Sequence, residues 1–263
     1  MIRRGYSDGP FGQVHWRLCG ARTEEPDLFC LHPAPFSGLA FTAIMPFLAS
    51  HRQVIAPDFP GHGGSDPHRP DASIGDYAKA MASVIADLSP GRPVDLLGFH
   101  TGCLVACELS LLAPAAIRSL VLIDVPAFDQ ETRREHLAAS AAPPRFSEDL
   151  ASLAPAWERG ITRRVESQGL QRSFAMFVEQ LRHGEMMNAG FHAGFSYPVE
   201  ERLAAATHPT AVIATRSMLL EPSRRAASLI PGAHLIERLD ITRAVLDEAA
   251  EPMAQQVLAS LPS

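Results

Sequence analysis

Short apolar runs alternate with longer amphipathic segments along most of this chain. The runs at 28–31, 94–97 and 211–214 are mainly apolar, which is typical of strands buried on both faces. Residues 74–88 place apolar side chains at helical spacing behind Ser73, a residue type that caps helix N-termini. Strands that alternate with helices in this way predict βαβ units, so the fold class is α/β with a mostly parallel sheet flanked by helices.

This alternation of strand-like and helical segments is interrupted between residues 126 and 207. Strand-like runs are missing there, and short helical segments rich in Arg, Glu and Ala take their place. We therefore predict one core, formed by residues 1–125 and 208–263, with residues 126–207 inserted as a helical cap. Because the insertion follows a strand, we expect it over the carboxyl edge of the sheet, where α/β proteins bind their ligands.

Composition argues against several classes of protein. A chain of 263 residues suffices for one large α/β domain, and its formal net charge of −6 argues against a nucleic-acid partner. No apolar run approaches the roughly 18 residues that cross a bilayer, and the N-terminus does not resemble a secretory signal. Four scattered Cys indicate reduced thiols in a cytoplasm. We expect a cytoplasmic protein with a small-molecule substrate, without a membrane partner, metal or other cofactor; a homodimer stays open.

Three segments that follow predicted strands carry the chemistry. Residues 31–38 read Leu-His-Pro-Ala-Pro-Phe-Ser-Gly, residues 56–66 read Ala-Pro-Asp-Phe-Pro-Gly-His-Gly-Gly-Ser-Asp, and residues 96–102 read Leu-Leu-Gly-Phe-His-Thr-Gly. Together these motifs make the chain resemble the α/β-hydrolase superfamily, and the order of elements extends the resemblance over nearly the whole chain. The resemblance implies an α/β-hydrolase fold, with a twisted, mostly parallel sheet and an inserted helical cap.

The turn at 98–102 resembles the nucleophile elbow G-x-S-x-G, except that His100 stands where the family has Ser. In such a turn, flanking side chains would collide with the strand and the helix, which explains the two glycines. The central residue has a positive φ, which His tolerates better than most residue types, and its side chain projects above the sheet. We expect His100 in a pocket as a catalytic base or nucleophile; alternatively, it only fills the tip of a degenerate turn.

The resemblance also implies an oxyanion hole built from two main-chain amides, those of Thr101 and Ala34. Thr101 begins a helix, and a helix N-terminus favours negative charge. Because main-chain donors require no particular side chain, they can persist when a catalytic triad is lost. Phe36 and Phe99, close to these two positions, are predicted to contact the substrate.

The acid and the histidine of the family's triad are missing from their usual positions. Met218 stands near the acid's position, and Arg243 stands near the position of the histidine. No His occurs between residues 235 and 263 to replace it. The chain therefore cannot perform Ser-His-Asp acyl transfer with the usual residues.

Asp124 ends the strand after the elbow helix, where some family members carry their acid. A carboxylate within hydrogen-bond reach of His100 would fix its tautomer and raise its basicity, so we predict a His100–Asp124 dyad. Arg243 is predicted to bind a substrate carboxylate or a developing oxyanion. The alternatives are a loop cap for Asp124 and a surface ion pair for Arg243. His192, late in the insertion, is predicted to reach the substrate unless it is purely structural.

Two functions fit these residues. The first is an enzyme that acts on a small, partly apolar carbonyl compound, namely an ester, thioester, β-diketone or β-keto acid, by hydrolysis or lyase-type chemistry without a Ser nucleophile. The second is an inactive relative that keeps the pocket as a ligand-binding or sensor module. The two retained glycines favour the first, because a strained turn is costly to keep, and the loss of all three triad residue types favours the second. Fold alone does not decide between them.

Overall fold

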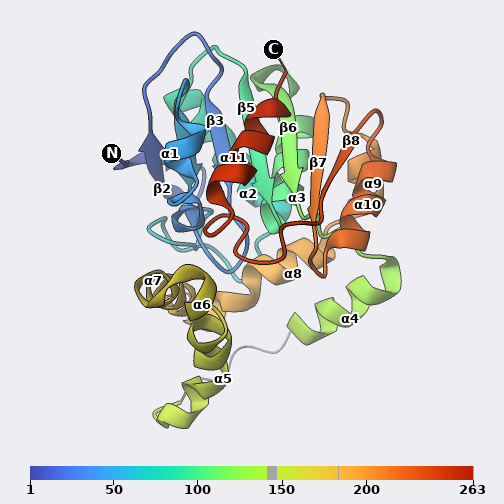
Figure 1. Cartoon of the computed structure of the whole chain (residues 1–263). Coiled ribbons are helices and arrows are strands. Elements are labelled where there is room, and N and C mark those ends of the chain that lie inside the picture. The colour runs from blue at the N-terminus through green and yellow to red at the C-terminus, as the bar shows by residue number, and fades with distance from the viewer. Residues whose placement is uncertain (141–146, 183, 263) are drawn as a thin grey trace.

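An eight-stranded sheet forms the centre of the molecule (Figure 1). The computed structural model describes residues 1–140, 147–182 and 184–262. The strands are β1 (Arg3–Gly9), β2 (Gly12–Cys19), β3 (Leu28–Leu31), β4 (Val54–Pro57), β5 (Val94–Phe99), β6 (Ile117–Ile123), β7 (Thr210–Thr215) and β8 (His234–Arg238). Their order in the sheet is β1-β2-β4-β3-β5-β6-β7-β8, and only the β1–β2 and β2–β4 pairs are antiparallel. The predicted α/β fold with a mostly parallel sheet is confirmed.

Helices cover both faces of this sheet (Figure 1). They are α1 (Met45–Leu48), α2 (Ile74–Leu88), α3 (Thr101–Leu112), α10 (Leu220–Leu229) and α11 (Ala250–Ala259). Leu48 of α1 and Met253 of α11 belong to one buried apolar cluster, whereas Met81 of α2, Leu104 of α3 and Ala226 of α10 belong to a second cluster. The sheet is therefore buried between two helical layers, as its apolar strands require.

Between β6 and β7 the described residues form helices and no strand. The α-helices are α4 (Gln130–Ser140), α5 (Ala154–Trp157), α6 (Val165–Gln168), α7 (Leu170–Leu181), α8 (Ala189–Ser196) and α9 (Val199–Ala204). Figure 1 shows α4 to α8, here called the helical insertion, gathered at one end of the sheet. The predicted boundaries of 126–207 enclose residues 141–146 and 183, which lie outside the described residues. Within the described chain, every helix is too short or too polar to span a bilayer.

Two ends of the core differ from the sequence pattern. The sequence pattern predicts a first strand at residues 14–19, but in the structure β1 precedes it and pairs with β2 from Arg3 to Gly9. Because β1 is largely polar and exposed, only its pairing with β2 makes it a strand. The same pattern predicts a closing helix over residues 244–261, whereas α11 begins at Ala250. Ala244 has a φ of 44°, which is incompatible with a right-handed helix.

Two glycines allow β5 to turn directly into α3. A Cβ atom on Gly98 would lie 2.6 Å from the Cα of Cys103, and one on Gly102 would lie 1.9 Å from the carbonyl oxygen of Leu31. The collisions expected from the sequence are thus with the following helix and with the end of β3. The start of α3 is held close against the loop that follows β3.

Gly102→Ala should lower the free energy of unfolding by about 3 kcal/mol, because the clash is with main chain that cannot rotate away. Urea denaturation measures this loss. Gly75→Ala is the matched control, since a Cβ there meets only the Ser73 hydroxyl at 3.6 Å. Equal stability changes in the two variants would contradict the tight packing described here.

Candidate active site

A cavity of about 530 Å³ lies at the carboxyl edge of the sheet, against the helical insertion. Its walls come from the loops after β3, β5, β6, β7 and β8 and from the insertion. The volume falls within the range of roughly 300–1,000 Å³ that small-molecule sites occupy. The residues predicted from sequence that line it are Ala34, Phe36, Phe99, His100, Asp124 and Arg243.

A smaller hollow of about 220 Å³, here called the aromatic recess, shares His100 and Ala34 with the cavity. Its apolar walls include the rings of Phe128, His136, Phe191 and Phe195 together with Met218. The ring of His136 stacks on that of Phe195 with 5.0 Å between centroids. His100 therefore stands where two hollows of different character meet.

His100 occupies the strained turn between β5 and α3. Its φ is 51° and its ψ is −118°, so the positive φ predicted for this position is present. The side chain is half-buried, lines both hollows and lies against the ring of Phe99 with 4.0 Å between centroids. The expected location of His100 is therefore found, and its catalytic role stays a prediction.

The His100 ring is neutral at physiological pH. Burial lowers its pKa to about 4, and the positive charge of Arg164 adds to this effect. Within the described residues, the ring nitrogens take part in no hydrogen bond. One nitrogen thus keeps a free lone pair, although a group with this pKa is a weak base.

Two main-chain amides adjoin His100. In the described part of the chain, the N–H groups of Thr101 and Ala34 donate no hydrogen bond to the protein. Thr101 is the first residue of α3, so its amide is one of the unsatisfied donors at a helix N-terminus. Both residues line the aromatic recess beside His100. Such a pair of donors can hold a developing oxyanion, as the sequence predicts.

Asp124 does not form the predicted dyad with His100. Its carboxylate accepts hydrogen bonds from the backbone N–H of Thr215 at 2.8 Å and from the Thr215 hydroxyl at 2.7 Å. Burial raises the pKa of Asp124, and the hydrogen bonds from Thr215 and Ser217 partly offset that effect. Because β6 and β7 are neighbours in the sheet, the end of β7 engages the carboxylate, and Asp124 acts as a loop cap.

Asp124→Asn is expected to cost about 1–3 kcal/mol of folding stability while leaving the pH dependence of any turnover unchanged. The amide would lose the charge that strengthens both bonds from Thr215. Urea denaturation and a pH–rate profile measure the two effects. Asp129→Asn, at an exposed position, is the control. If Asp124→Asn reacts more slowly, with a shifted acid limb of the pH–rate profile and unchanged stability, the predicted His100–Asp124 dyad is supported instead.

The structure also contradicts the role predicted for Arg243. Its guanidinium lies 3.1 Å from Glu248 and 3.3 Å from Glu166, and half of its side chain is exposed. Two carboxylates already neutralise Arg243 in a surface ion pair, although the sequence suggests Asp240 or Asp247 as the partner and the structure has Glu166 and Glu248.

His192 is not at the predicted place either. It lines a separate hollow with residues 71–75 and with α9, whereas its neighbour Phe191 lines the cavity. Successive residues of a helix point about 100° apart, which turns His192 away when Phe191 faces His100.

Arg164 is the functional candidate that sequence reasoning missed. It lies half-buried in the cavity wall, with its guanidinium carbon 5.4 Å from the centre of the Phe36 ring. No carboxylate among the described residues lies within 4 Å of it. Since the insertion contains many Arg residues and no strand pattern that would orient them, no signal in the sequence distinguishes Arg164.

Among the described residues, neither His32 nor a metal-binding group contributes to the candidate site. His32 has a structural role, because its Nε2 accepts a hydrogen bond from the backbone N–H of Phe59 at 2.9 Å. Across residues 1–140, 147–182 and 184–262, no three His, Cys, Asp or Glu side chains gather as a metal-binding group.

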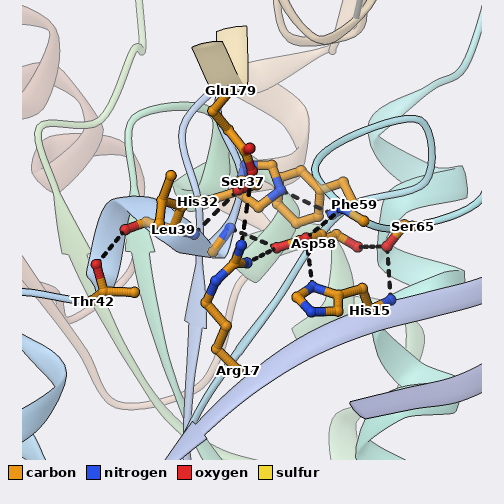
Figure 2. Close-up of polar contacts among 12 residues, drawn as sticks. His15, Arg17, His32, Ser37, Leu39, Thr42, Asp58, Phe59, Ser65 and Glu179 are labelled. Carbon is orange, nitrogen blue, oxygen red and sulfur yellow. Dashed lines mark hydrogen bonds and ion pairs between the residues drawn. The ribbon is translucent and has the colours of Figure 1, made fainter. Parts of the chain in front are cut away.

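A buried polar network holds the loop after β3 in place (Figure 2). Asp58 accepts hydrogen bonds from Arg17 at 2.7 Å and from the Nδ1 of His15 at 2.8 Å. Ser37 donates to Glu179 of α7, whose carboxylate lies 3.8 Å from Arg17. The network thus links β2, the loops after β3 and β4, and the insertion, and it anchors the loop that contains Ala34.

Comparisons with known proteins agree with this fold. Residues 26–189 match a family model described as alpha/beta hydrolase fold. A serine hydrolase-like protein of Danio rerio is 31% identical over 121 residues, which cover 45% of this chain and 36% of that protein. A pimeloyl-[acyl-carrier protein] methyl ester esterase of Aeromonas hydrophila is 35% identical over 99 residues, which cover 37% of each. The matches thus span little more than a third of these curated relatives.

Solved structures resemble the chain over almost its whole length. A hydrolase from Pseudomonas aeruginosa superposes with a TM-score of 0.81, at 23% identity and 99% coverage of both chains. An enol-lactonase from Burkholderia xenovorans superposes with a TM-score of 0.79, at 18% identity, covering 97% of this chain and 99% of that one. At such identities the likeness shows the fold alone.

Proposed function

The chain belongs to the α/β-hydrolase fold family, and from this premise we propose that it hydrolyses small, partly apolar carbonyl compounds, esters or thioesters, without a serine nucleophile. The observation that carries the proposal is the position of His100. It stands at a turn with positive φ, in a cavity, beside two amides that donate no hydrogen bond within the described chain. Relatives named as an esterase and as a serine hydrolase-like protein support the hydrolase class.

In the proposed reaction the neutral ring nitrogen of His100 attacks the carbonyl carbon. A C–N bond forms, and the carbonyl electron pair moves onto oxygen, where the amides of Thr101 and Ala34 stabilise it. The collapse of this intermediate breaks the bond to the leaving alkoxide or thiolate. The leaving group takes up the proton that the acylated ring loses from its other nitrogen, so a neutral acyl-imidazole remains. Water then attacks the acyl-imidazole, releases the carboxylic acid and restores the ring. The insertion acts as a cap that closes the cavity over the substrate.

A substrate panel with acid quenching tests the proposal. Aryl esters, acyl thioesters, a β-diketone and a β-keto acid are incubated with the protein, and peptides are mapped by mass spectrometry after millisecond quenching. We expect turnover of an ester or thioester and an acyl group on the peptide that contains His100. Turnover without this adduct, under conditions where a burst precedes the steady state, would assign the acyl group to another residue.

The pH dependence follows from the environment of His100. Protonation removes the lone pair, and the pKa of His100 is about 4, so kcat/KM should stay constant from pH 8 to about 5 and fall as the pH drops through 4. Arg164→Gln removes a positive charge and should move this acid limb upward. If the acid limb of the native protein's kcat/KM profile lies near the ordinary His pKa of about 6.5, the assignment to His100 is wrong.

A second candidate is a ligand-binding protein without turnover. It is favoured by the absence of a hydrogen-bond partner for the His100 ring among the described residues and by the low pKa of about 4, which makes the ring a poor base. Calorimetric binding of panel compounds, together with hydrolysis no faster than in buffer, would establish this alternative.

A further inference from the structure

We propose that the substrate carries a carboxylate bound by Arg164 and an apolar group held in the aromatic recess, with its reactive carbonyl at His100 between them. This inference rests on the proposed function and specifies its substrate class. Its elements are a half-buried cation of the cavity wall that no described carboxylate pairs with, an apolar hollow, and a shared wall at His100.

Arg164 differs from the other arginines of the cavity wall in burial and pairing. Arg163 lies 3.3 Å from Glu158, and Arg243 has two glutamates within 3.3 Å. Arg159 is exposed, so water satisfies it. Arg164 is half-buried, and no carboxylate of the described chain lies within 4 Å of it. A partly desolvated cation without a counterion is costly, and a bound anion would offset that cost.

The nearest acidic group is not available to Arg164. The charge of Asp247 influences Arg164 electrostatically, without an ion pair between the two side chains. The Asp247 carboxylate instead accepts hydrogen bonds from Arg172 at 2.7 Å and from Gln168 at 2.8 Å. Burial lowers the pKa of Arg164, which agrees with a guanidinium that lacks a close anionic partner. Within the described chain, the charge of Arg164 therefore stays available to a ligand in the cavity.

The orientation of Arg164 suits a carboxylate. Its guanidinium carbon lies over the ring of Phe36, 5.4 Å from the ring centre. The N–H donors lie in the plane, where they can form two parallel hydrogen bonds to a carboxylate. Among the described residues, Arg164 is the half-buried arginine of the cavity wall without a paired carboxylate, and its single charge matches that of such a group.

The aromatic recess suits the opposite end of the substrate. Its volume of about 220 Å³ accommodates a phenyl ring or a short alkyl chain, and the rings of Phe128, Phe191 and Phe195 line it. Apolar surface that enters such a hollow contributes about 25 cal/mol for each Å² removed from water. Since His100 lines both hollows, a ligand that spans them brings its middle to the imidazole.

Paired substrates test the carboxylate. The 4-nitrophenyl ester of adipic acid has a free carboxylate, and its methylated counterpart, 4-nitrophenyl methyl adipate, does not. We expect the native protein to prefer the free acid by about 10- to 100-fold in kcat/KM and Arg164→Gln to lose this preference. Arg224→Gln is the control that keeps it, because Arg224 of α10 is paired with Glu221 and Glu237 and lines neither hollow. Equal preference in the native protein and Arg164→Gln would overturn the inference.

A binding experiment separates this inference from the proposed function. Calorimetry compares 6-phenylhexanoate with 6-phenylhexanamide, which lacks the charge, and with hexanoate, which lacks the ring. We expect 6-phenylhexanoate to bind the native protein at least about tenfold more tightly than either. Carboxylate preference without turnover would refute only the proposed hydrolysis. Turnover of esters with equal binding of the acid and the amide would refute only the anchor at Arg164.

Discussion

His100→Ala should lower kcat/KM for the best ester or thioester by about 10² to 10⁴-fold. The variant keeps both main-chain amides and the cavity, so the residual rate measures oxyanion stabilisation and binding alone. Initial rates at pH 7 with the panel substrates give the ratio. Because truncation at the tip of a surface-accessible turn removes little packing, we expect the fold to remain intact.

The controls for this variant use the same residue type and the same position. His192→Ala removes a histidine of α8 that lines a different hollow, and it should leave the rate unchanged. His100→Ser restores the hydroxyl that the family carries, but it should stay as slow as His100→Ala, since neither an acid nor a histidine stands at the usual positions to activate it. If His100→Ala retains a rate within threefold of native, the imidazole takes no part in the chemistry.

The core of the fold could be predicted from sequence because its signals are local. Runs such as 28–31 and 211–214 are apolar on both faces, which is the pattern of a buried strand in a parallel sheet. The strand β1 was missed because its residues carry no such pattern, and it depends on hydrogen bonds to β2. Periodicity within one segment predicts an element; it does not predict an element that a neighbour induces.

The residues of the candidate site follow the same rule, because those encoded locally could be predicted and those placed by distant segments could not. The positions of His100 and Thr101 could be predicted because their turn is encoded in consecutive residues, and that of Ala34 because it lies in the segment directly after β3. The partner of Asp124 was mispredicted, since its choice between His100 and Thr215 depends on how strand ends align across the sheet. Arg164 comes from the insertion, and its place over Phe36 results from packing between distant segments that no local pattern reports.

The second large effect concerns stability. Asp58→Asn should lower the free energy of unfolding by about 3–5 kcal/mol, because it leaves Arg17 buried beside an uncharged amide. Asp58 is fully buried, and besides Arg17 and His15 it accepts hydrogen bonds from the backbone N–H groups of Gly38 and Gly64 (Figure 2). The amide group of asparagine cannot accept at both of its ends. Urea denaturation at pH 7 measures the loss.

The pH dependence of this loss distinguishes a charge effect from a packing effect. Burial alone would raise the pKa of Asp58, but the hydrogen bond from His15 and the charge of Arg17 outweigh it, and the pKa falls below its ordinary value of 3.8. A carboxylate with a lowered pKa stabilises the fold fully above the ordinary pKa, and that contribution disappears as the pH falls through the lowered one. The native protein should therefore lose its advantage over Asp58→Asn in acid.

Asp66→Asn, at an exposed carboxylate that accepts from the backbone N–H of Gln13, should cost less than about 1 kcal/mol at any pH. A constant difference between native and Asp58→Asn from pH 7 to pH 3 would mean that shape, and not charge, makes Asp58 important.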